Sequence, residues 1–356
     1  MLRAGAIVLE RYVIDAPIGE GGMGSVFRAR HVHLDSLVAV KVLRDFNDAD
    51  KAATLSRFTR EGKLLAKLRH PNVVRVVDFG TLPEAGGAPC IVMELLEGPS
   101  FEDLLMDHGA LPFEQVLALA MAGASALDSI HQHGILHRDV KPANFVQAPD
   151  GIRLVDFGIA LAQKEDARLT RAGSLVGTPA YAAPEYLLDA ISSPATDMYS
   201  LGVALYELLT GQLPYSPDNL ALLVREALKG PPPLKVPSYR TAPPGVFAQL
   251  VMRMLSPKPE LRPTAAHVVA SANAIQKEAS KRAGRGSSSA LDDFAKLASS
   301  GSSEMWPAVA PPGSVRPTPN NPSSVPPQSD VAPTSRDRGT WSRPFPKPGA
   351  KKKSSG

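Results

Sequence analysis

The chain has 356 residues, and 44% of them are hydrophobic, so it can bury a large core and is not disordered or fibrous as a whole. Its single cysteine, Cys90, excludes an intrachain disulfide, argues against a multi-cysteine metal site and fits a reducing compartment such as the cytoplasm. The net charge of +4 is no sign of specific nucleic-acid binding, because residues 284–356 hold 10 Lys/Arg against 5 Asp/Glu while the rest is nearly balanced at 29 against 30.

The first hundred residues have the character of strands. Segments of alternating or β-branched residues are separated there by Gly, Pro or Asp. We expect strands at Tyr12–Ile18, Gly24–His31, Val38–Leu43, Val73–Gly80 and Cys90–Leu95. Between them, Ala52–Leu68 carries apolar residues at roughly helical spacing and predicts a helix.

From Phe101 on, helices dominate the pattern. We expect helices at Phe113–His133, Pro194–Thr210 and Pro244–Leu255, and the first of these is apolar enough to be buried. The sequence therefore predicts an α+β chain with a small β-rich lobe followed by a larger helical lobe.

The composition changes near Lys281. Twelve of the 34 prolines lie in residues 284–356, among Ser-rich and basic pieces. Such a stretch buries too little apolar area to offset its ordering entropy, so we expect a disordered tail, with a short helix near Leu291–Ala298. A Pro-rich tail can also dock in an aromatic groove. The chain has no uncharged apolar run of about 18 residues and no secretory signal after Met1.

A glycine-rich segment near the start matches the pattern G-x-G-x-x-G-x-V. It comprises Ile18, Gly19, Glu20, Gly21, Gly22, Met23, Gly24, Ser25 and Val26. Alone the pattern is weak evidence for a nucleotide-binding loop, since a glycine-rich hairpin turn can have the same sequence pattern. A dinucleotide-binding fold needs a strand before the glycines and a helix after them, whereas here a strand follows. That favours a strand–loop–strand flap whose backbone amides can lie close to phosphates.

Lys41 lies among small apolar residues, 17 residues after Gly24. A lysine in a strand is often just an edge charge, but beneath a glycine flap it can bind the α- and β-phosphates of a nucleotide. It then needs a carboxylate to hold it, and Glu61 on the predicted helix is the candidate. The alternative is that Glu61 is an exposed helix glutamate that pairs with a neighbouring Arg or Lys.

The strongest signal is the segment from His137 to Asn144, in which Pro142 disfavours a regular helix and indicates a loop. Asp139 can orient a hydroxyl and accept its proton, Lys141 can offset charge on a transferring phosphoryl group, and Asn144 can hold a magnesium ion.

Further motifs follow in order. Asp156 ends a short apolar strand twelve residues after Asn144 and, in this order, indicates a second magnesium ligand rather than an ordinary turn. Three more motifs follow these: Ala183-Pro184-Glu185, Asp197 at the start of an apolar helix, and Arg262.

With these pieces in one order, the chain resembles a bacterial, eukaryotic-like (Hanks-type) serine/threonine protein kinase over residues 12–275. The resemblance implies a small lobe at about 12–93, a large lobe at about 97–275, and ATP and Mg²⁺ as substrate and metal. It implies that Gly19–Val26 covers ATP and that Glu61 braces Lys41. It assigns Asp139 as the catalytic base, Asn144 and Asp156 as metal ligands, Glu185 as the partner of Arg262, and Asp197 as the anchor of the catalytic loop.

The resemblance also assigns the adenine site. Met93 would be the gatekeeper, the backbones of Glu94 and Leu96 would read adenine, and Val26 and Ala39 would sandwich the ring.

Serine/threonine specificity is indicated by Lys141, two residues after the catalytic Asp, and by Thr178 as the platform for the substrate hydroxyl. Arg138 before the catalytic Asp implies control by a phosphate on the activation segment, for which Thr170 is the first candidate and Ser174 the second. The alternative is that both are unmodified loop residues.

Three other functions compete. A pseudokinase scaffold usually lacks the equivalent of Lys41, Asp139 or Asp156, and all three are present. A small-molecule kinase usually lacks the Ala-Pro-Glu segment and the full glycine loop, and an oxidoreductase leaves His137–Asn144 unexplained. The expected partners are protein substrates and, through the small lobe, a second kinase domain.

Overall fold

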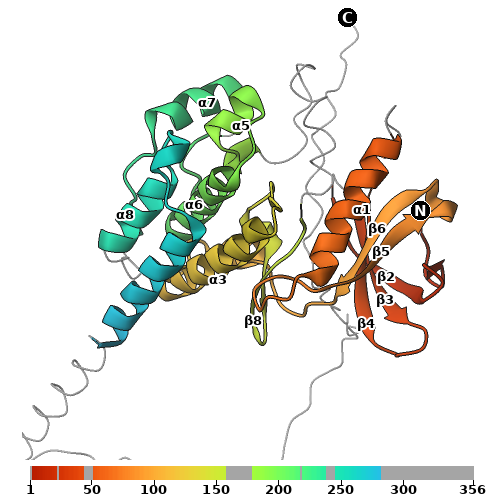
Figure 1. Cartoon of the computed structure of the whole chain (residues 1–356). Helices are drawn as coiled ribbons and strands as arrows, with labels where there is room; N and C mark the ends of the chain where they lie inside the picture. Colours follow the sequence, from red (N-terminus) through yellow and green to blue (C-terminus); the bar gives the residue numbers. More distant parts are fainter. Residues whose placement is uncertain are drawn as a thin grey trace, which may run out of the picture. The chain divides into compact units, whose positions relative to one another are not determined.

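The computed structural model describes residues 2–21, 24–43, 51–157, 179–216, 219–237 and 245–281, apart from the side chains of 51–54, 57 and 84 (Figure 1). The described residues up to Lys277 belong to one compact unit, and 278–281 belong to a second. Within the first unit a β-rich segment is followed by a helical one, which confirms the predicted fold class.

The small lobe is built on one six-stranded sheet with the order β1-β2-β3-β4-β6-β5. Its strands are β1 (Ile7–Val8), β2 (Tyr12–Gly21), β3 (Gly24–His31), β4 (Leu37–Leu43), β5 (Val76–Leu82) and β6 (Ala88–Glu94). All of its strand pairs are antiparallel. A separate hairpin is formed by β7 (Phe145–Ala148) and β8 (Gly151–Leu154).

Strand β2 runs through Pro17 and extends three residues beyond the predicted end at Ile18. The β2–β3 register shifts between Ile14 and Ala16 and again between Pro17 and Gly19. Irregular pairing of this kind is how a sheet accommodates a residue that lacks a backbone N–H. Strand β5 begins at Val76, later than predicted, because Val73 instead forms a parallel bridge with Leu154 of β8.

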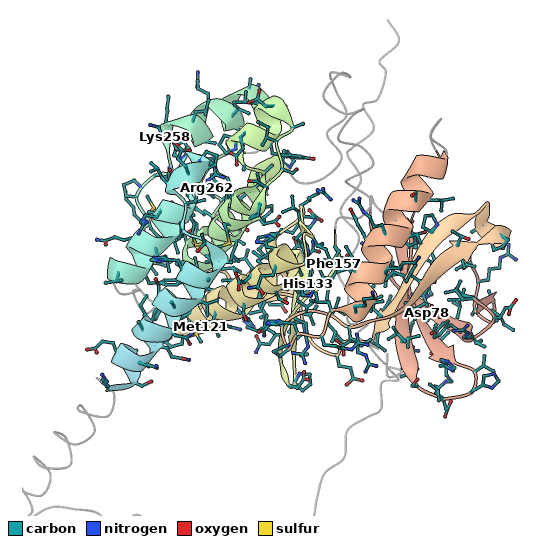
Figure 2. All side chains as sticks on the ribbon, viewed as in Figure 1. Asp78, Met121, His133, Phe157, Lys258 and Arg262 are labelled. Carbon is teal, nitrogen blue, oxygen red and sulfur yellow. The ribbon has the colours of Figure 1, made fainter. Side chains whose placement is uncertain are left out.

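A small second core covers one face of this sheet. Val8, Cys90 and Val92 are fully buried in it, together with residues of β2, β3 and β4. The β1–β2 turn reaches across to β5, since the Leu9 side chain lies against Gly80. The Arg11 guanidinium also pairs with Asp78 of β5 at 3.2 Å (Figure 2).

The helices are α1 (Lys51–Lys67), α2 (Phe101–His108), α3 (Phe113–Gln132), α5 (Pro184–Asp189), α6 (Pro194–Thr210), α7 (Leu220–Lys229) and α8 (Gly245–Met254). A further helix covers 265–281. Helix α2 begins at a capping box, because the Ser100 hydroxyl accepts the amide of Asp103 while the Asp103 carboxylate accepts the amide of Ser100.

The main core is centred on α3 and α6, which pack together in the large lobe (Figure 1). Helix α6 is buried nearly all round, as expected of a helix enclosed by other elements. Phe113 of α3 and Phe247 of α8 meet edge to face, with ring centroids 5.3 Å apart. Among the described residues, no helix has the length and apolar character needed to cross a membrane.

Candidate active site

The glycine-rich segment forms the ends of β2 and β3, as the strand–loop–strand prediction required. Gly21 pairs with Gly24, while Gly22 and Met23 lie outside the described residues. A Cβ atom at Gly24 would lie 2.1 Å from the carbonyl oxygen of Val42, so only glycine lets β3 approach β4 there. A strand rather than a helix follows the glycines, which makes the dinucleotide-binding interpretation wrong.

Lys41 lies in the middle of β4, opposite Val26 of β3 and Ile91 of β6. Its side chain is buried, and Nζ contacts Oδ1 of Asp156 at 3.0 Å. The pair joins the small-lobe sheet to the end of the segment that follows β8. A buried ammonium needs such a partner, because burial of an unpaired charge is costly.

Most of the residues predicted to contact adenine lie in this sheet, on β3, β4 and β6. Ala39 pairs with Met93, and both are buried. Val26 packs against the main core, and Leu96 is buried just beyond the end of β6. The backbone amide of Glu94 donates to the carbonyl of Arg75 at 3.0 Å.

The catalytic-loop residues meet within hydrogen-bond distance. Lys141 Nζ lies 2.9 Å from Oδ2 of Asp139. Asn144 is held in a short 3-10 helix, and its Nδ2 donates to the Asp139 backbone oxygen at 2.7 Å and to Oδ2 at 3.1 Å. The sequence places these three residues close together, and the loop turns all three side chains toward one point.

The loop contains a residue with strained backbone. Arg138 has a φ of 64°, in the left-handed region that non-glycine residues avoid at a cost of about 1–3 kcal/mol. The carboxylate of Asp197, at the start of α6, accepts two consecutive amides at this turn, from His137 at 2.9 Å and from Arg138 at 2.8 Å. This is the anchoring contact that the resemblance implied for Asp197.

His137 links the loop to the segment that carries Asp156. Its Nε2 donates to the carbonyl of Val155 at 2.9 Å, and its ring lies 5.3 Å from that of Phe157 (Figure 2). Complete burial lowers the pKa of His137 below its ordinary value, so the ring is neutral at pH 7. Asp156 itself has a left-handed φ of 61°, and its carboxylate contacts Lys41.

Glu61, the predicted brace of Lys41, lies in α1 with its carboxylate oriented toward the catalytic loop. Its Oε1 is 3.8 Å from Nη1 of Arg138, and both side chains are mostly buried. The structure thus brings together Lys41 with Asp156 and Glu61 with Arg138. The Lys41–Glu61 pair stays a prediction.

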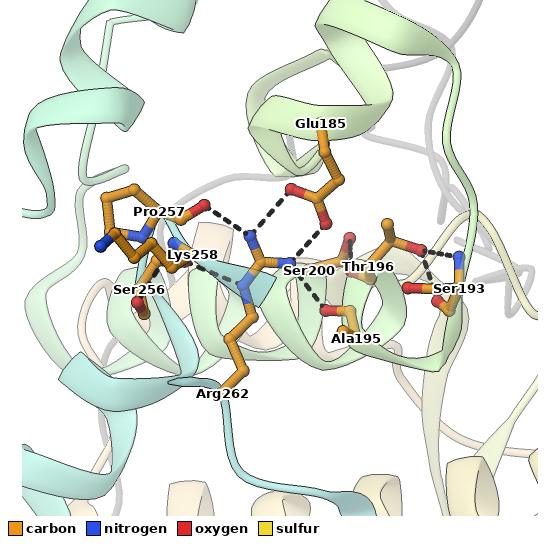
Figure 3. Close-up of polar contacts among 9 residues, drawn as sticks. All are labelled: Glu185, Ser193, Ala195, Thr196, Ser200, Ser256, Pro257, Lys258 and Arg262. Atoms are coloured by element: carbon orange, nitrogen blue, oxygen red, sulfur yellow. Dashed lines mark hydrogen bonds and ion pairs between the residues drawn. The ribbon is translucent and has the colours of Figure 1, made fainter. Parts of the chain in front are cut away.

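Glu185 and Arg262 form a buried, two-pronged ion pair. The guanidinium donates from Nη1 at 2.6 Å and from Nη2 at 2.8 Å to the two carboxylate oxygens (Figure 3). It also donates to the carbonyls of Ser256, Ala195 and Pro257, and its side chain is fully buried. The pair therefore ties α5 to α6 and to the chain that follows α8.

Two features near the site escaped the sequence analysis. The Tyr181 hydroxyl donates to Glu207 Oε2 at 2.6 Å, and burial raises the pKa of the Glu207 carboxyl. His131 at the end of α3 contacts Oδ2 of Asp197 at 2.8 Å. No local pattern could reveal either contact, since the partners lie 26 and 66 residues apart.

Several predicted residues lie outside the described residues. They are the phosphorylation candidates Thr170 and Ser174 and the substrate-platform residue Thr178. Their roles stay predictions.

Asn144 and Asp156 carry the kinds of oxygen atom that bind a magnesium ion. Among the described residues, no group of three or more His, Cys, Asp or Glu side chains is placed to hold a metal. Mg²⁺ needs fewer protein ligands than such a group supplies. It is usually bound by one or two carboxylates, and water molecules and substrate phosphates provide its other ligands. Since Nδ2 of Asn144 donates to Asp139, its amide oxygen is left for a metal, and Asp156 supplies a carboxylate.

Comparisons with known proteins agree with this geometry. A family model described as the protein kinase domain matches residues 12–272. Serine/threonine-protein kinase pkn3 of Myxococcus xanthus is 37% identical over 286 residues, which cover 77% of this chain and 51% of pkn3. The chain therefore spans about half the length of that relative.

Two solved structures are also similar. A point mutant of the Mycobacterium tuberculosis PknI kinase domain has a TM-score of 0.60 at 29% identity, over 78% of this chain and 99% of that one. Rad53 in complex with AMP-PNP has a TM-score of 0.58 at 28% identity, over 73% of this chain and 64% of that one.

Proposed function

The chain belongs to the protein kinase domain family, and on that premise we propose that it is a serine/threonine protein kinase that uses ATP. The observation that carries the proposal is the grouping of Asp139, Lys141 and Asn144 at 2.7–3.1 Å in one loop. The Lys41–Asp156 pair completes the set of charged groups that phosphoryl transfer requires.

In the reaction, a serine or threonine hydroxyl oxygen attacks the γ-phosphorus, the bond to the β–γ bridging oxygen breaks, and ADP leaves. Asp139 orients the hydroxyl and takes up its proton. Lys141 offsets the negative charge that develops on the transferring group. Mg²⁺, held by Asn144 and Asp156, would neutralise the phosphates and fix their orientation.

Lys41 has a second task when the nucleotide binds. We assign its Nζ to the α- and β-phosphates, with Glu61 taking over as its carboxylate partner. That requires Lys41 to exchange Asp156 for Glu61, and it frees Asp156 for the metal. The nucleotide-binding residues are those of the glycine-rich segment and of the β6 end assigned above.

Activation by phosphorylation is part of the proposal. A phosphate of about −2 charge on Thr170 or Ser174 would compete with Glu61 for Arg138. Glu61 could then turn to Lys41. Thr170→Ala should lengthen the lag of autophosphorylation. Unchanged autophosphorylation kinetics in both Thr170→Ala and Ser174→Ala would contradict activation by phosphorylation at these residues.

Two alternatives are disfavoured. A scaffold without activity would have no need of Lys41, Asp139 and Asp156 together. A small-molecule kinase would have no use for the Ala-Pro-Glu segment, which is tied into the large lobe through Glu185 and Arg262.

We assign catalysis to residues 12–275 and no catalytic role to residues 284–356. We propose a cytoplasmic location, which the single, buried Cys90 supports. A small-lobe homodimer is also proposed, and Val32, Leu34 and Leu37 of the small lobe offer exposed apolar surface for it. Sedimentation of the purified chain, compared with Leu34→Asp, tests the homodimer.

The function is tested by incubating the chain with labelled Mg-ATP and a generic protein acceptor. Asp139→Asn should abolish transfer yet still bind ATP. Asp150→Asn is the matched control, because Asp150 is an exposed carboxylate in the β7–β8 turn. Transfer that survives in Asp139→Asn, or a wild-type protein that binds ATP without transferring phosphate, would contradict the proposal.

A further inference from the structure

We propose that His131 is a positioning residue for the proposed kinase reaction: by holding the carboxylate of Asp197, it fixes the turn that aims Asp139. The proposal rests on the proposed function and adds a residue from a third element, α3, to the catalytic loop. It starts from the 2.8 Å contact between His131 Nε2 and Asp197 Oδ2.

The Asp197 carboxylate is almost completely buried and contacts three donors. Oδ1 accepts the amide of Arg138 at 2.8 Å, and Oδ2 accepts the amide of His137 at 2.9 Å. The His131 ring contacts the same Oδ2. Because both backbone donors belong to the catalytic loop, the orientation of this one carboxylate sets the position of two consecutive loop amides.

Those amides belong to the strained residue of the loop and to the residue before it. Arg138 has a left-handed φ of 64°, and Asp139 follows it directly. A strained conformation persists only where its surroundings determine it. If the Asp197 carboxylate rotates, the turn can relax, and Asp139 then loses its alignment with Lys141 and Asn144.

His131 keeps the carboxylate from rotating. It lies in the last turn of α3, and its side chain is only 10% exposed, so water has little access to replace it. Without the ring, Oδ2 keeps a single donor in a buried place. The alternative is a purely structural role, in which His131 only ties α3 to α6 and adds stability.

The two roles differ in what they change. A misaligned base slows the chemical step and leaves nucleotide binding intact, because Lys41 and the glycine-rich segment belong to the other lobe. A merely structural contact lowers the unfolding temperature and leaves kcat per folded molecule unchanged. The measurement is therefore kcat and KM for ATP, normalised to folded protein, beside the unfolding temperature.

For the full chain, His131→Leu should lower kcat about 10- to 100-fold, with KM for ATP changed less than about twofold. His131→Gln, which keeps an N–H donor, should recover most of kcat, whereas the shorter His131→Asn should not. The matched control is His133→Leu, because His133 is exposed and its Nδ1 contacts a carbonyl of its own helix (Figure 2).

A double-mutant cycle tests whether His131 acts through Asp197. In the background of Asp197→Asn, which weakens the anchor, His131→Leu should change kcat by less than about twofold. Full, multiplicative losses would show independent action and overturn the proposal. If one of these variants does not fold, the proposal is tested by comparing His131→Gln with His131→Asn. Equal kcat values in these two variants would overturn the proposal.

An active wild-type chain with unchanged kcat in His131→Leu would also overturn this inference and leave the proposed function standing. An inactive wild-type chain that binds ATP would contradict the proposed function first.

Discussion

Replacing Arg262 with leucine should cost this protein a large part of its stability. The guanidinium is fully buried, meets both oxygens of Glu185 and donates to three backbone carbonyls. It also lies 4.8 Å from the ring centre of Tyr199. Arg262→Leu leaves the mostly buried Glu185 carboxylate without this partner, which costs about 3–5 kcal/mol.

That loss is a large share of the roughly 5–15 kcal/mol by which proteins are stable. For a domain of this size it corresponds to a fall in Tm on the order of 10 °C. Arg262→Lys should lose less, because an ammonium keeps the charge but not the two-pronged geometry. The assay is urea unfolding monitored by circular dichroism. The unfolding midpoints of the variants are compared, provided that their m values are equal.

Two controls sharpen this test. The double variant Arg262→Leu, Glu185→Leu removes both charges and should regain much of the lost stability. Arg253→Leu removes an exposed arginine at the end of α8 and should change the midpoint little. If Arg262→Leu loses less than about 1 kcal/mol, or the double variant is no more stable than the single one, the reasoning about the buried pair is refuted.

Three further outcomes are expected. Gly24→Ala should raise KM for ATP and lower stability, because its Cβ would collide with the carbonyl of Val42, and equal KM and Tm values would contradict this. Since burial lowers the pKa of His137, the unfolded chain binds its proton more tightly, so stability should fall as the pH drops below about 6.5. In urea unfolding between pH 7.5 and 5.5, His137→Phe should show a shallower fall than the wild type, and parallel curves would speak against it. Truncation after Lys281 should leave kcat unchanged in the phosphotransfer assay, whereas a loss in a folded truncated chain would show that the tail contributes.

Local patterns predicted the long elements of the fold well. Gly24–His31 and Pro194–Thr210 have the bounds expected from strand alternation and from an apolar helical run. Short elements such as β1, β7 and α5 were missed, because two to six residues give too little periodicity. Helix α2 was also missed, although Ser100 and Asp103 carry the spacing of a capping box.

The contacts of the candidate site divide more clearly into those that the sequence could reveal and those that it could not. Asp139, Lys141 and Asn144 could be found because they are close in sequence, and one loop is enough to bring them together. Ion pairs between elements depend on where those elements pack. The present partners of Lys41 and Glu61 depend on the position of α1 and of the segment after β8, which no spacing encodes.

The burial of Cys90 makes this protein well suited to spectroscopic labelling. The only thiol of the chain lies fully enclosed in the second core of the small lobe, where alkylating reagents have no access in the folded state. A cysteine introduced at a chosen surface position would therefore be the single reactive site. Fluorescent or spin probes could then report on one segment at a time, with the native residue at position 90 left in place.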